Sequence, residues 1–405
     1  MAKADNSVAI IGGGPAGLMA AEILSARGLR VTIYDRMPSL ARKFLMAGRG
    51  GLNLTHSEPF ETFVARYGAE SDTLRPILEA FPPAALIAWA HNLGQETFIG
   101  SSGRVFPKAM KASPMLRAWL ARLTDEGVTF RARHTWRGWD EIGALLFSTP
   151  QGDEHVSADA TLLALGGASW PRLGSDGGWQ QILSAEGVHV IPLVPSNCGF
   201  SVGWSEVFRT RFAGTPLKNV ALKFDNRSVR GELLITSYGV EGGAVYALSA
   251  ALRDGIAKHG PVPIAIDLRP ELATAALARR MQKPRGKETL SNLLRKTLHL
   301  APVEINLLRE TYGSALGIDA EKLAAQIKSV PLTLLTAQPI ARAISSAGGV
   351  AFNAVDGSLM LKARPGTYVA GEMLDWEAPT GGYLLQAVMA SGAFAAQAIL
   401  RRFAL

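Results

Sequence analysis

A glycine-rich turn near the N-terminus constrains the fold more than any other feature of this 405-residue chain. The segment VAIIGGGPAGLMAAEILSARGLRVTIYDR, residues 8–36, places Gly12, Gly14 and Gly17 between a short apolar run and a segment with helical apolar spacing. The first run predicts a strand buried on both faces, and Gly28 marks the end of the predicted helix. The β-branched run that follows predicts a second, parallel strand. This order predicts a βαβ unit and hence an α/β domain.

The spacing of the three glycines is typical of a turn that binds a dinucleotide. Gly12 permits the tight turn, Gly14 lets a pyrophosphate approach the backbone, and Gly17 lets helix and strand pack closely. The helix that begins at Pro15 offers free N–H groups and the positive end of its dipole to the phosphates. Asp35, eighteen residues beyond Gly17, would accept hydrogen bonds from ribose hydroxyls. The alternative is a structural turn with an exposed aspartate, which the full context disfavours.

A second glycine-rich segment, near the C-terminus, indicates which dinucleotide is bound. A short strand-like run ends at Gly371 and Glu372, and Gly382 opens a long Ala-rich helix. An FAD molecule held at the first turn would reach this segment, where Gly371 and Glu372 would meet the ribityl chain and the second phosphate. The helix after Gly382 would direct its positive end at the N1/O2 edge of the flavin. A closing strand and helix with a structural turn would suit the same residues equally well.

Composition and cysteine content favour a folded, cytoplasmic protein. Apolar residues make up 48% of the chain and charged residues 19%, which is typical of globular domains. The single cysteine, Cys198, excludes a disulfide framework and favours a reducing compartment. We expect no secretion signal, because no basic segment followed by an apolar run opens the chain. We also expect no membrane span, because the most apolar run is interrupted by Gln386 and Gln397 and is shorter than the roughly 20 residues required.

The net charge of +8 raises the question of nucleic acid binding. Basic residues are spread along the chain, and the densest group is Arg279, Arg280, Lys283, Arg285, Lys287, Arg295 and Lys296. Such runs usually form a solvated helical face, and no RNA-binding aromatic signature or zinc-ligand spacing accompanies this one. We therefore expect a small-molecule substrate and no metal, with nucleic acid kept as an alternative. The sequence indicates nothing about the oligomeric state.

The pattern of strand-like and helix-like segments along the sequence predicts a discontinuous domain that carries an insertion. Residues 1–195 and 339–405 have α/β character, whereas residues 196–338 form the insertion, β-rich over 196–267 and helical over 268–330. The predicted fold is therefore a Rossmann-like nucleotide-binding domain built from both chain ends, with an inserted β-plus-helical domain.

Two local predictions concern the first of these segments. A helix should begin with Ser113 as N-cap and Pro114 as its first residue, and should stop at Gly127. The residues QGDE, 151–154, should form a turn between two strands.

Several blocks together resemble the bacterial YhiN/BaiN-type FAD-dependent flavoproteins, which belong to the two-dinucleotide-binding-domain superfamily. Members are often labelled NAD(P)/FAD-dependent or aminoacetone-oxidase-family oxidoreductases. The resemblance rests on IIGGGPAGLMAA, RKFLMAGRGGLNLTHSE, GRVFPKAMKAS, LLALGGASWPRLGSDGGW, GELLITSYGVEGGAVYALS, GGVAFNAV and the tail AGE…GGYLLQA…SG. It implies an FAD domain made from both chain ends, interrupted by a barrel and a helical piece.

The resemblance also implies a set of cofactor-binding residues. Residues 42–58 would form a flavin-contacting loop, for which the alternative is a Gly-rich surface loop. Residues 164–167 would pass close to FAD, for which the alternative is a structural exit from a strand. The predicted set is Gly12, Gly14, Pro15, Ala16, Gly17, Asp35, Arg36, Lys43, Arg49, Gly50, Gly51, Asn53, Thr55, Ala164, Gly166, Gly167, Gly371, Glu372, Gly382, Tyr383 and Leu384.

The chain departs from this family at two places. Leu52 stands where the family commonly has cysteine, and Ser237 stands where it often has histidine. Position 52 therefore offers no thiol, and both departures leave the substrate open.

Residues for acid–base chemistry are scarce. No Ser-His-Asp triad, paired carboxylates or metal-ligand set is evident. His56, Arg104 and Tyr383 are the candidate catalytic residues, although a lone histidine is more often structural. This scarcity suits a flavoenzyme, since the isoalloxazine supplies the electron chemistry.

These observations predict an FAD-dependent oxidoreductase that passes electrons through flavin N5 to or from an organic substrate. NAD(P)H is the candidate reductant. It would dock transiently, because the chain contains no second Gly-x-Gly-x-x-Gly. The alternatives are a flavoprotein that modifies RNA and a non-catalytic redox sensor.

Overall fold

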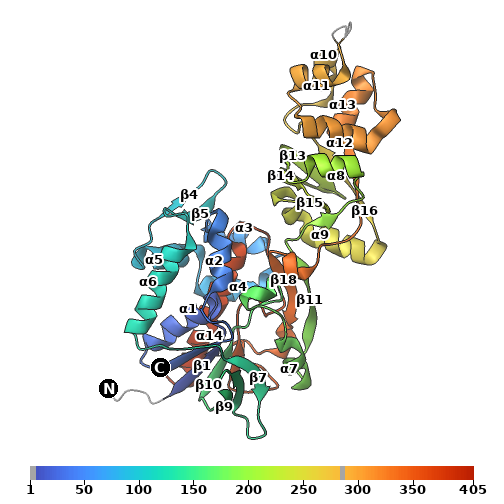
Figure 1. The fold of residues 1–405 in the computed structure, drawn as a ribbon. Coiled ribbons are helices and arrows are strands. Elements are labelled where there is room, and N and C mark those ends of the chain that lie inside the picture. The colour runs from blue at the N-terminus through green and yellow to red at the C-terminus, as the bar shows by residue number, and fades with distance from the viewer. Residues whose placement is uncertain (1–5, 283–287) are drawn as a thin grey trace. The chain divides into compact units, whose positions relative to one another are not determined.

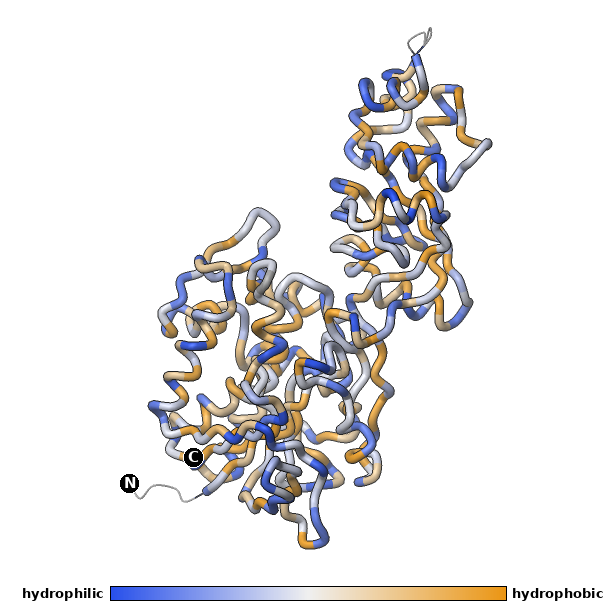
Figure 2. The backbone as a smooth tube through the Cα atoms, in the orientation of Figure 1, coloured by the Kyte–Doolittle hydropathy of each residue, from blue (hydrophilic) through white to orange (hydrophobic). Residues whose placement is uncertain are grey.

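The computed structural model describes residues 6–282 and 288–405, and the chain forms two compact units (Figure 1). We call Met1–Val194 with Ile344–Leu405 the nucleotide unit, and Pro195–Ala343 the inserted unit. Each unit has its own apolar core, and Figure 2 shows apolar residues along the elements of both. The inserted unit extends five residues beyond the expected position 338, because Ala343 is buried in its core.

A five-stranded parallel sheet forms the centre of the nucleotide unit. Its order is β19-β10-β1-β2-β6, and all neighbours are parallel. The strands are β1 (Ser7–Ile11), β2 (Arg30–Asp35), β6 (Thr129–Ala132), β10 (Ala160–Leu163) and β19 (Thr367–Val369). Because the carboxyl ends of parallel strands meet at one edge, the loops after β1, β10 and β19 lie together there. This sheet confirms the predicted Rossmann-type α/β fold.

Two helices pack closely beside this sheet because glycines remove the side chains between them. α1 (Pro15–Ser25) packs against α14 (Tyr383–Arg402), and a Cβ added to Gly392 of α14 would lie 2.3 Å from the carbonyl oxygen of Ala16. A Cβ on Gly17 would lie 2.1 Å from the carbonyl oxygen of Gly12, which explains the close packing of α1 on its own turn.

The helix α14 is longer than the apolar run from which we expected no membrane span. It spans 20 residues, and by length and composition alone it is the one helix of the described chain that could cross a membrane. However, 72% of its most apolar window is buried inside the unit, and the core helix of a soluble protein passes the same test. Its Ala-rich composition serves the close contact with α1.

The other elements of the nucleotide unit surround this sheet. Smaller sheets have the orders β3-β5-β4, β7-β8-β9 and β11-β18. Their strands are β3 (Thr55–His56), β4 (Thr97–Ile99), β5 (Arg104–Pro107), β7 (Thr135–Trp139), β8 (Leu145–Thr149), β9 (Gly152–Val156), β11 (Val190–Ser196) and β18 (Ser345–Val350). The remaining α-helices are α2 (Arg42–Ala47), α3 (Phe60–Ala65), α4 (Ser71–Ala80), α5 (Pro83–Asn92), α6 (Ala112–Asp125) and α7 (Trp179–Ala185). The short 3₁₀ helices are η1 (Gly48–Gly50), η2 (Gly68–Glu70), η3 (Pro171–Leu173) and η6 (Phe352–Ala354).

Two local predictions in this unit are wrong. α6 begins at Ala112, so Ser113 and Pro114 lie inside its first turn, where proline is tolerated because its missing N–H needs no partner. Asp153 and Glu154 lie in β9 rather than in a turn, because β9 completes an antiparallel sheet with β8.

The inserted unit contains an antiparallel sheet that closes on itself. Its strand order is β12-β15-β14-β13-β16-β17. The backbone N–H of Ser201 donates to the Thr336 carbonyl at 2.8 Å, and that of Leu335 donates to the Ser201 carbonyl at 2.9 Å, which joins the two edges. The sheet is thus barrel-like, as expected. Its strands are β12 (Phe200–Ser201), β13 (Pro216–Phe224), β14 (Arg227–Ile235), β15 (Gly239–Glu241), β16 (Val262–Asp267) and β17 (Val330–Leu334).

Helices complete the inserted unit. They are α8 (Glu206–Phe212), α9 (Gly243–His259), α10 (Thr274–Met281), α11 (Leu290–Leu298), α12 (Pro302–Tyr312) and α13 (Ala320–Lys328), with the short η4 (Gly313–Ala315) and η5 (Ile340–Arg342). The basic residues Lys283, Arg285 and Lys287 lie outside the described residues, whereas Arg279, Arg280 and Arg295 are exposed on α10 and α11.

Candidate functional site

The turn after β1 leaves the N-terminus of α1 open. Gly14 is the N-cap, and a Cβ on it would meet no atom within 4 Å. The first N–H groups of a helix, here those of Ala16 and Gly17, have no acceptor within the helix and suit an anion. Gly12, in contrast, has a φ of +111°, and its Cβ would lie 2.2 Å from the Ala164 carbonyl oxygen. Protein packing thus explains the glycine at position 12, and open space that suits a pyrophosphate explains Gly14.

Asp35 is held beside this turn by two backbone groups. Its Oδ2 accepts from the Gly13 N–H at 2.9 Å, and its Oδ1 accepts from the Met37 N–H at 2.8 Å. Burial raises the pKa of Asp35, although these two hydrogen bonds and nearby arginines oppose the shift. Each carboxylate oxygen retains a lone pair for a ribose hydroxyl. The neighbouring Arg36 pairs with Asp176.

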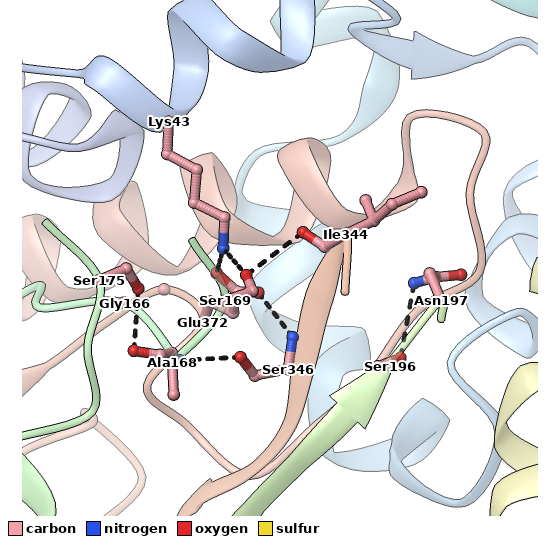
Figure 3. A network of polar contacts seen from close by, with 12 residues as sticks. Lys43, Gly166, Ala168, Ser169, Ser175, Ser196, Asn197, Ile344, Ser346 and Glu372 are labelled. Atoms are coloured by element: carbon pink, nitrogen blue, oxygen red, sulfur yellow. Dashed lines mark hydrogen bonds and ion pairs between the residues drawn. The ribbon is translucent and has the colours of Figure 1, made fainter. Parts of the chain in front are cut away.

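Lys43 and Glu372, which are far apart in the sequence, form a buried ion pair (Figure 3). Lys43 Nζ lies 2.6 Å from Glu372 Oε2 and donates to Ser169 Oγ. The other carboxylate oxygen, Glu372 Oε1, accepts from the Ser346 N–H at 2.9 Å, and Ser346 Oγ accepts from the Ala168 N–H. The Glu372 side chain is 7% exposed and that of Lys43 is 25% exposed. The pair therefore joins α2, the loop after β10, β18 and the loop after β19.

The glycines in two of these loops are explained by neighbouring protein atoms. A Cβ on Gly167 would lie 2.2 Å from Ser346 Oγ, and one on Gly166, where φ is +71°, would lie 2.8 Å from a serine hydroxyl. The N–H of Gly371 donates to Ser391 Oγ at 2.9 Å, and its carbonyl accepts from the indole of Trp376. Both backbone groups of Gly371 are thus used within the protein, and this residue fixes the position of Glu372.

Two buried polar atoms lie on Asn53, in the loop that precedes β3, and on Thr55, the first residue of β3. Asn53 Oδ1 and Thr55 Oγ1 have no hydrogen-bond partner among the described residues. Buried polar groups are rarely left unpaired, so these atoms point to a bound group. Thr55 lies directly beneath the start of α14, because a Cβ on Gly382, where φ is +96°, would lie 2.6 Å from Thr55 Cα.

The rest of this loop is open on one side. A Cβ on Gly50 would meet nothing within 4 Å, whereas one on Gly51 would lie 2.7 Å from the methyl carbon of Met110. Arg49 belongs to η1, and its side chain lies outside what the structure describes. Leu52, which stands where the family commonly has cysteine, is 1% exposed and packs in the core, so its role here is structural.

The N-termini of α1 and α14 have the spacing that an extended dinucleotide needs. Gly392 packs on Ala16 at the start of α1, and the N-cap of α14, Gly382, lies ten residues earlier. At 1.5 Å per residue, the start of α14 lies about 15 Å along its axis from the start of α1. A pyrophosphate at α1 therefore allows a flavin at α14, beside Asn53 and Thr55.

The candidate catalytic residues His56 and Tyr383 lie at the start of α14 with their polar atoms in use. Their rings stack with centroids 5.5 Å apart. His56 Nδ1 accepts from the Glu58 N–H, and Nε2 lies 2.9 Å from the Ser102 carbonyl oxygen, which assigns the neutral tautomer with the proton on Nε2. Tyr383 donates its hydroxyl proton to Glu58 at 2.7 Å, and burial and this hydrogen bond raise the pKa of Tyr383.

Arg66 completes this cluster, whereas two other predicted residues lie elsewhere. Arg66 donates twice to Glu58, and its hydrogen bonds hold the pKa of Glu58 below its usual value. Arg104 begins β5 and pairs in register with His56. Leu384 packs half-buried against the core. Sequence reasoning missed Glu58, Ser169 and Ser346, because no motif marks a residue whose partner comes from a distant loop.

The parallel sheet and the glycine turn between β1 and α1 define a protein with a Rossmann-type dinucleotide-binding domain. The chain belongs to the family described as HI0933-like protein Rossmann domain, whose model matches residues 6–398. This confirms the predicted family, and the chain is an FAD-dependent oxidoreductase.

Two curated relatives match nearly the whole chain. The 3-dehydro-bile acid delta(4,6)-reductase of Clostridium scindens is 26% identical over 414 residues, covering 98% of this chain and 100% of the relative. The ribosomal RNA dihydrouridine synthase of Haemophilus influenzae is 24% identical over 419 residues, covering 97% and 98%. Among solved structures, a 3-ketosteroid delta1-dehydrogenase from Sterolibacterium denitrificans has a TM-score of 0.55 at 12% identity, covering 98% of this chain and 100% of that chain, which shows a shared fold.

Proposed function

We propose that the chain reduces a carbon–carbon double bond of an organic substrate, with NAD(P)H as the source of electrons. In the balanced reaction NAD(P)H gives up one hydride equivalent and becomes NAD(P)⁺, and the double bond gains that hydride equivalent and one proton from water. When bound, FAD supplies the site that accepts and delivers the hydride. The proposal is supported by the names of the two full-length relatives, since one is a delta(4,6)-reductase and the other is a dihydrouridine synthase.

The residues that would hold FAD all belong to the nucleotide unit. The N–H groups at the start of α1 would bind the pyrophosphate, and Asp35 would bind ribose. Asn53 and Thr55 would pair with polar groups of the flavin and its ribityl chain, which satisfies their orphaned oxygens. The positive end of α14 would stabilise negative charge on the pyrimidine edge of the flavin. The orphaned oxygens beside the start of α14 are the observation that carries this assignment.

The cluster at the start of α14 favours a positioning role over proton donation. His56 uses both ring nitrogens, and Tyr383 would have to release Glu58 before it could donate to a substrate. Loss of the Tyr383 proton would also place a phenolate beside the Glu58 carboxylate, which is unfavourable. We therefore propose that these residues fix the loop around Thr55.

Stopped-flow absorbance with the FAD-loaded chain tests the proposal. NADH and NADPH are mixed separately with the protein without oxygen, and the long-wavelength flavin band is followed. We expect bleaching by at least one of them within seconds. Absence of bleaching with both would remove the nicotinamide-dependent reductase from consideration.

A second candidate, reduction of uridine in RNA, is favoured by the charge of one segment. Residues 279–296 contain seven basic residues and one acidic residue, a net charge of +6 out of the +8 of the whole chain. Arg279, Arg280 and Arg295 are exposed, and Lys296 pairs with Glu288. The name of the Haemophilus influenzae relative, a ribosomal RNA dihydrouridine synthase, also favours an RNA substrate.

Salt dependence distinguishes this second candidate. Binding to a ribosomal RNA fragment through several phosphates would weaken steeply between 50 and 200 mM salt, by a factor of about 10³ for six contacts. A double variant Arg279→Ala/Arg280→Ala should then show a shallower salt slope, whereas an unchanged slope would exclude this surface.

A further inference from the structure

A third buried polar atom without a partner lies near the start of α14. The side chain of Gln386 is fully buried, and its Oε1 has no hydrogen-bond partner among the described residues. Its Nε2 donates to the carbonyl oxygen of Phe81 at 2.6 Å. This bond fixes the orientation of the amide, because a flipped amide would place two oxygens against each other. Oε1 is therefore the free end of Gln386, and it can only accept a hydrogen bond.

Gln386 lies on the first turn of α14, beside the residues proposed to contact the flavin. Its N–H donates to the carbonyl oxygen of the N-cap Gly382 at 3.0 Å, and a Cβ on Gly382 would lie 2.6 Å from Thr55 Cα. A residue four positions later lies one turn further along the same side of a helix, and its side chain leans back towards the N-terminus. In addition, α14 packs against β3, which begins at Thr55. The amide of Gln386 is thus placed beside Thr55 and the N-terminus of α14.

The hydroxyl groups around this end of α14 do not supply the missing donor. Tyr67 donates its hydroxyl proton to the carbonyl oxygen of Tyr383 at 2.8 Å, and Tyr383 donates its own to Glu58. The hydroxyl of Thr55 is itself without a partner. A buried acceptor that lacks a donor lowers stability, and such groups are rarely left unpaired in folded proteins. The partner of Gln386 Oε1 is therefore a bound group that carries a hydrogen-bond donor.

The start of α14 and its two unpartnered side chains offer donor, acceptor and donor groups together. The first N–H groups of α14 have no acceptor within the helix, Gln386 Oε1 is an acceptor, and the Thr55 hydroxyl can donate. A ligand edge that complements this set has an N–H group between two carbonyl oxygens. The pyrimidine ring of the isoalloxazine has this order, O2, N3–H and O4, and N3–H is the one N–H group of the oxidised ring.

We infer that Gln386 is a cofactor-positioning residue whose Oε1 accepts a hydrogen bond from the N3–H of the flavin. The inference rests on the proposed function, which places the flavin at the start of α14. The bond from Nε2 to Phe81 anchors the amide to the segment between α4 and α5, so the acceptor is held by a second element of the nucleotide unit. Because N3 takes no part in hydride transfer, Gln386 contributes to the affinity and orientation of the ring. A ribityl hydroxyl and a buried water are the competing donors.

Binding of FAD and of FAD methylated at N3 to the cofactor-free full chain tests this inference. Methylation removes the proposed donor and leaves the ribityl hydroxyls in place. For the unaltered chain it should raise the dissociation constant, measured by fluorescence titration, at least about 10-fold, because Oε1 then stays unpaired. Gln386→Met removes the acceptor at a similar side-chain length, so it should weaken FAD binding about 10-fold and reduce the effect of methylation about 10-fold.

A matched control and a second measurement accompany this variant. Gln397→Met makes the same change at an exposed position of α14, and both cofactors should bind it as they bind the unaltered chain. Thermal unfolding without cofactor verifies that both variants fold. If Gln386→Met does not fold, the comparison of the two cofactors on the unaltered chain still decides, because equal affinities would overturn the inference.

Each other result overturns the inference and identifies the partner of Oε1. If Gln386→Met weakens both cofactors by the same factor, the donor is a ribityl hydroxyl, and if it leaves FAD binding unchanged, the donor is a water. If Asn53→Ala reduces the effect of methylation and Gln386→Met does not, Asn53 Oδ1 is the acceptor of N3–H. Because these titrations need no electron transfer, failure of NAD(P)H to bleach the flavin would refute the proposed function without affecting them.

Discussion

Removing Lys43 should destabilise the nucleotide unit more than neutralising its partner Glu372. In Lys43→Met the carboxylate stays almost fully buried and keeps only the Ser346 N–H, whereas in Glu372→Gln the ammonium can turn to solvent because the Lys43 side chain is 25% exposed. Breaking a buried pair costs about 3–5 kcal/mol when it strands a buried charge. We therefore expect a loss of about 3 kcal/mol for Lys43→Met and about 1 kcal/mol for Glu372→Gln.

The double variant gives the sharper result. Lys43→Met/Glu372→Gln contains no stranded charge, and the amide oxygen that it introduces at position 372 can still accept from the Ser346 N–H. It should therefore recover most of the loss, ending about 1.5 kcal/mol below the unaltered chain. This gives a coupling energy of about 2.5 kcal/mol between the two positions.

Calorimetric unfolding of the cofactor-free chain measures these differences. At about 3 °C per kcal/mol for a unit of this size, the transition of the nucleotide unit should move down by about 9 °C in Lys43→Met. The transition of the inserted unit is the internal control and should not move. Equal losses in the two single variants, or additive losses in the double variant, would refute the argument that burial of Glu372 governs this network.

Three further predictions follow from individual atoms of the site. Gly14→Ala should leave the melting temperature within about 3 °C of the unaltered chain, because its backbone (φ −83°) suits alanine and its Cβ meets nothing, yet it should weaken FAD binding, measured by fluorescence titration, at least about 10-fold. Gly382→Ala should cost about 3 kcal/mol or more in urea unfolding of the cofactor-free chain, because it combines a φ of +96° with a clash against Thr55. Burial and Glu58 raise the pKa of Tyr383 above its ordinary value of 10.0, so its contribution is fully present below pH 10 and is lost above it. Tyr383→Phe should therefore lose less stability than the unaltered chain between pH 10 and 11, and equal slopes in urea unfolding would contradict this assignment.

The parallel sheet could be predicted because its information is local. The strand before Gly12, the helix after it and the strand that ends at Asp35 each carry their own apolar period and turn residues. The glycines at 371 and 382 likewise follow from local φ requirements. The sequence indicated the inserted barrel only by a change to short strand-like runs. Closure of the barrel depends on backbone hydrogen bonds such as that between Ser201 and Thr336, which no side-chain pattern encodes.

The candidate site was less predictable, because its polar partners come from distant segments. Lys43 and Glu372 are separated by 329 positions, and Ser169 and Ser346 contribute through one hydroxyl or one N–H each. The sequence predicted that Gly167 clears space for a cofactor, whereas the structure shows that Ser346 occupies the space beside it. A glycine can thus be required either by a bound cofactor or by a neighbouring protein side chain, and only the three-dimensional contacts distinguish the two cases.

The positions of Cys198 and Leu52 limit the routes by which electrons could leave the flavin. The chain has one cysteine, and Cys198 is 1% exposed in the inserted unit, where burial raises the pKa of its thiol. A buried thiol with a raised pKa is a poor nucleophile, and the loop that we propose contacts the flavin carries Leu52 in the core instead of a thiol. Electrons that reach the flavin therefore cannot pass on through a dithiol of this chain. Under the proposed function the electron acceptor therefore binds beside the flavin itself, and the open space at Gly50, where an added Cβ would meet no protein atom within 4 Å, is where such a molecule could approach.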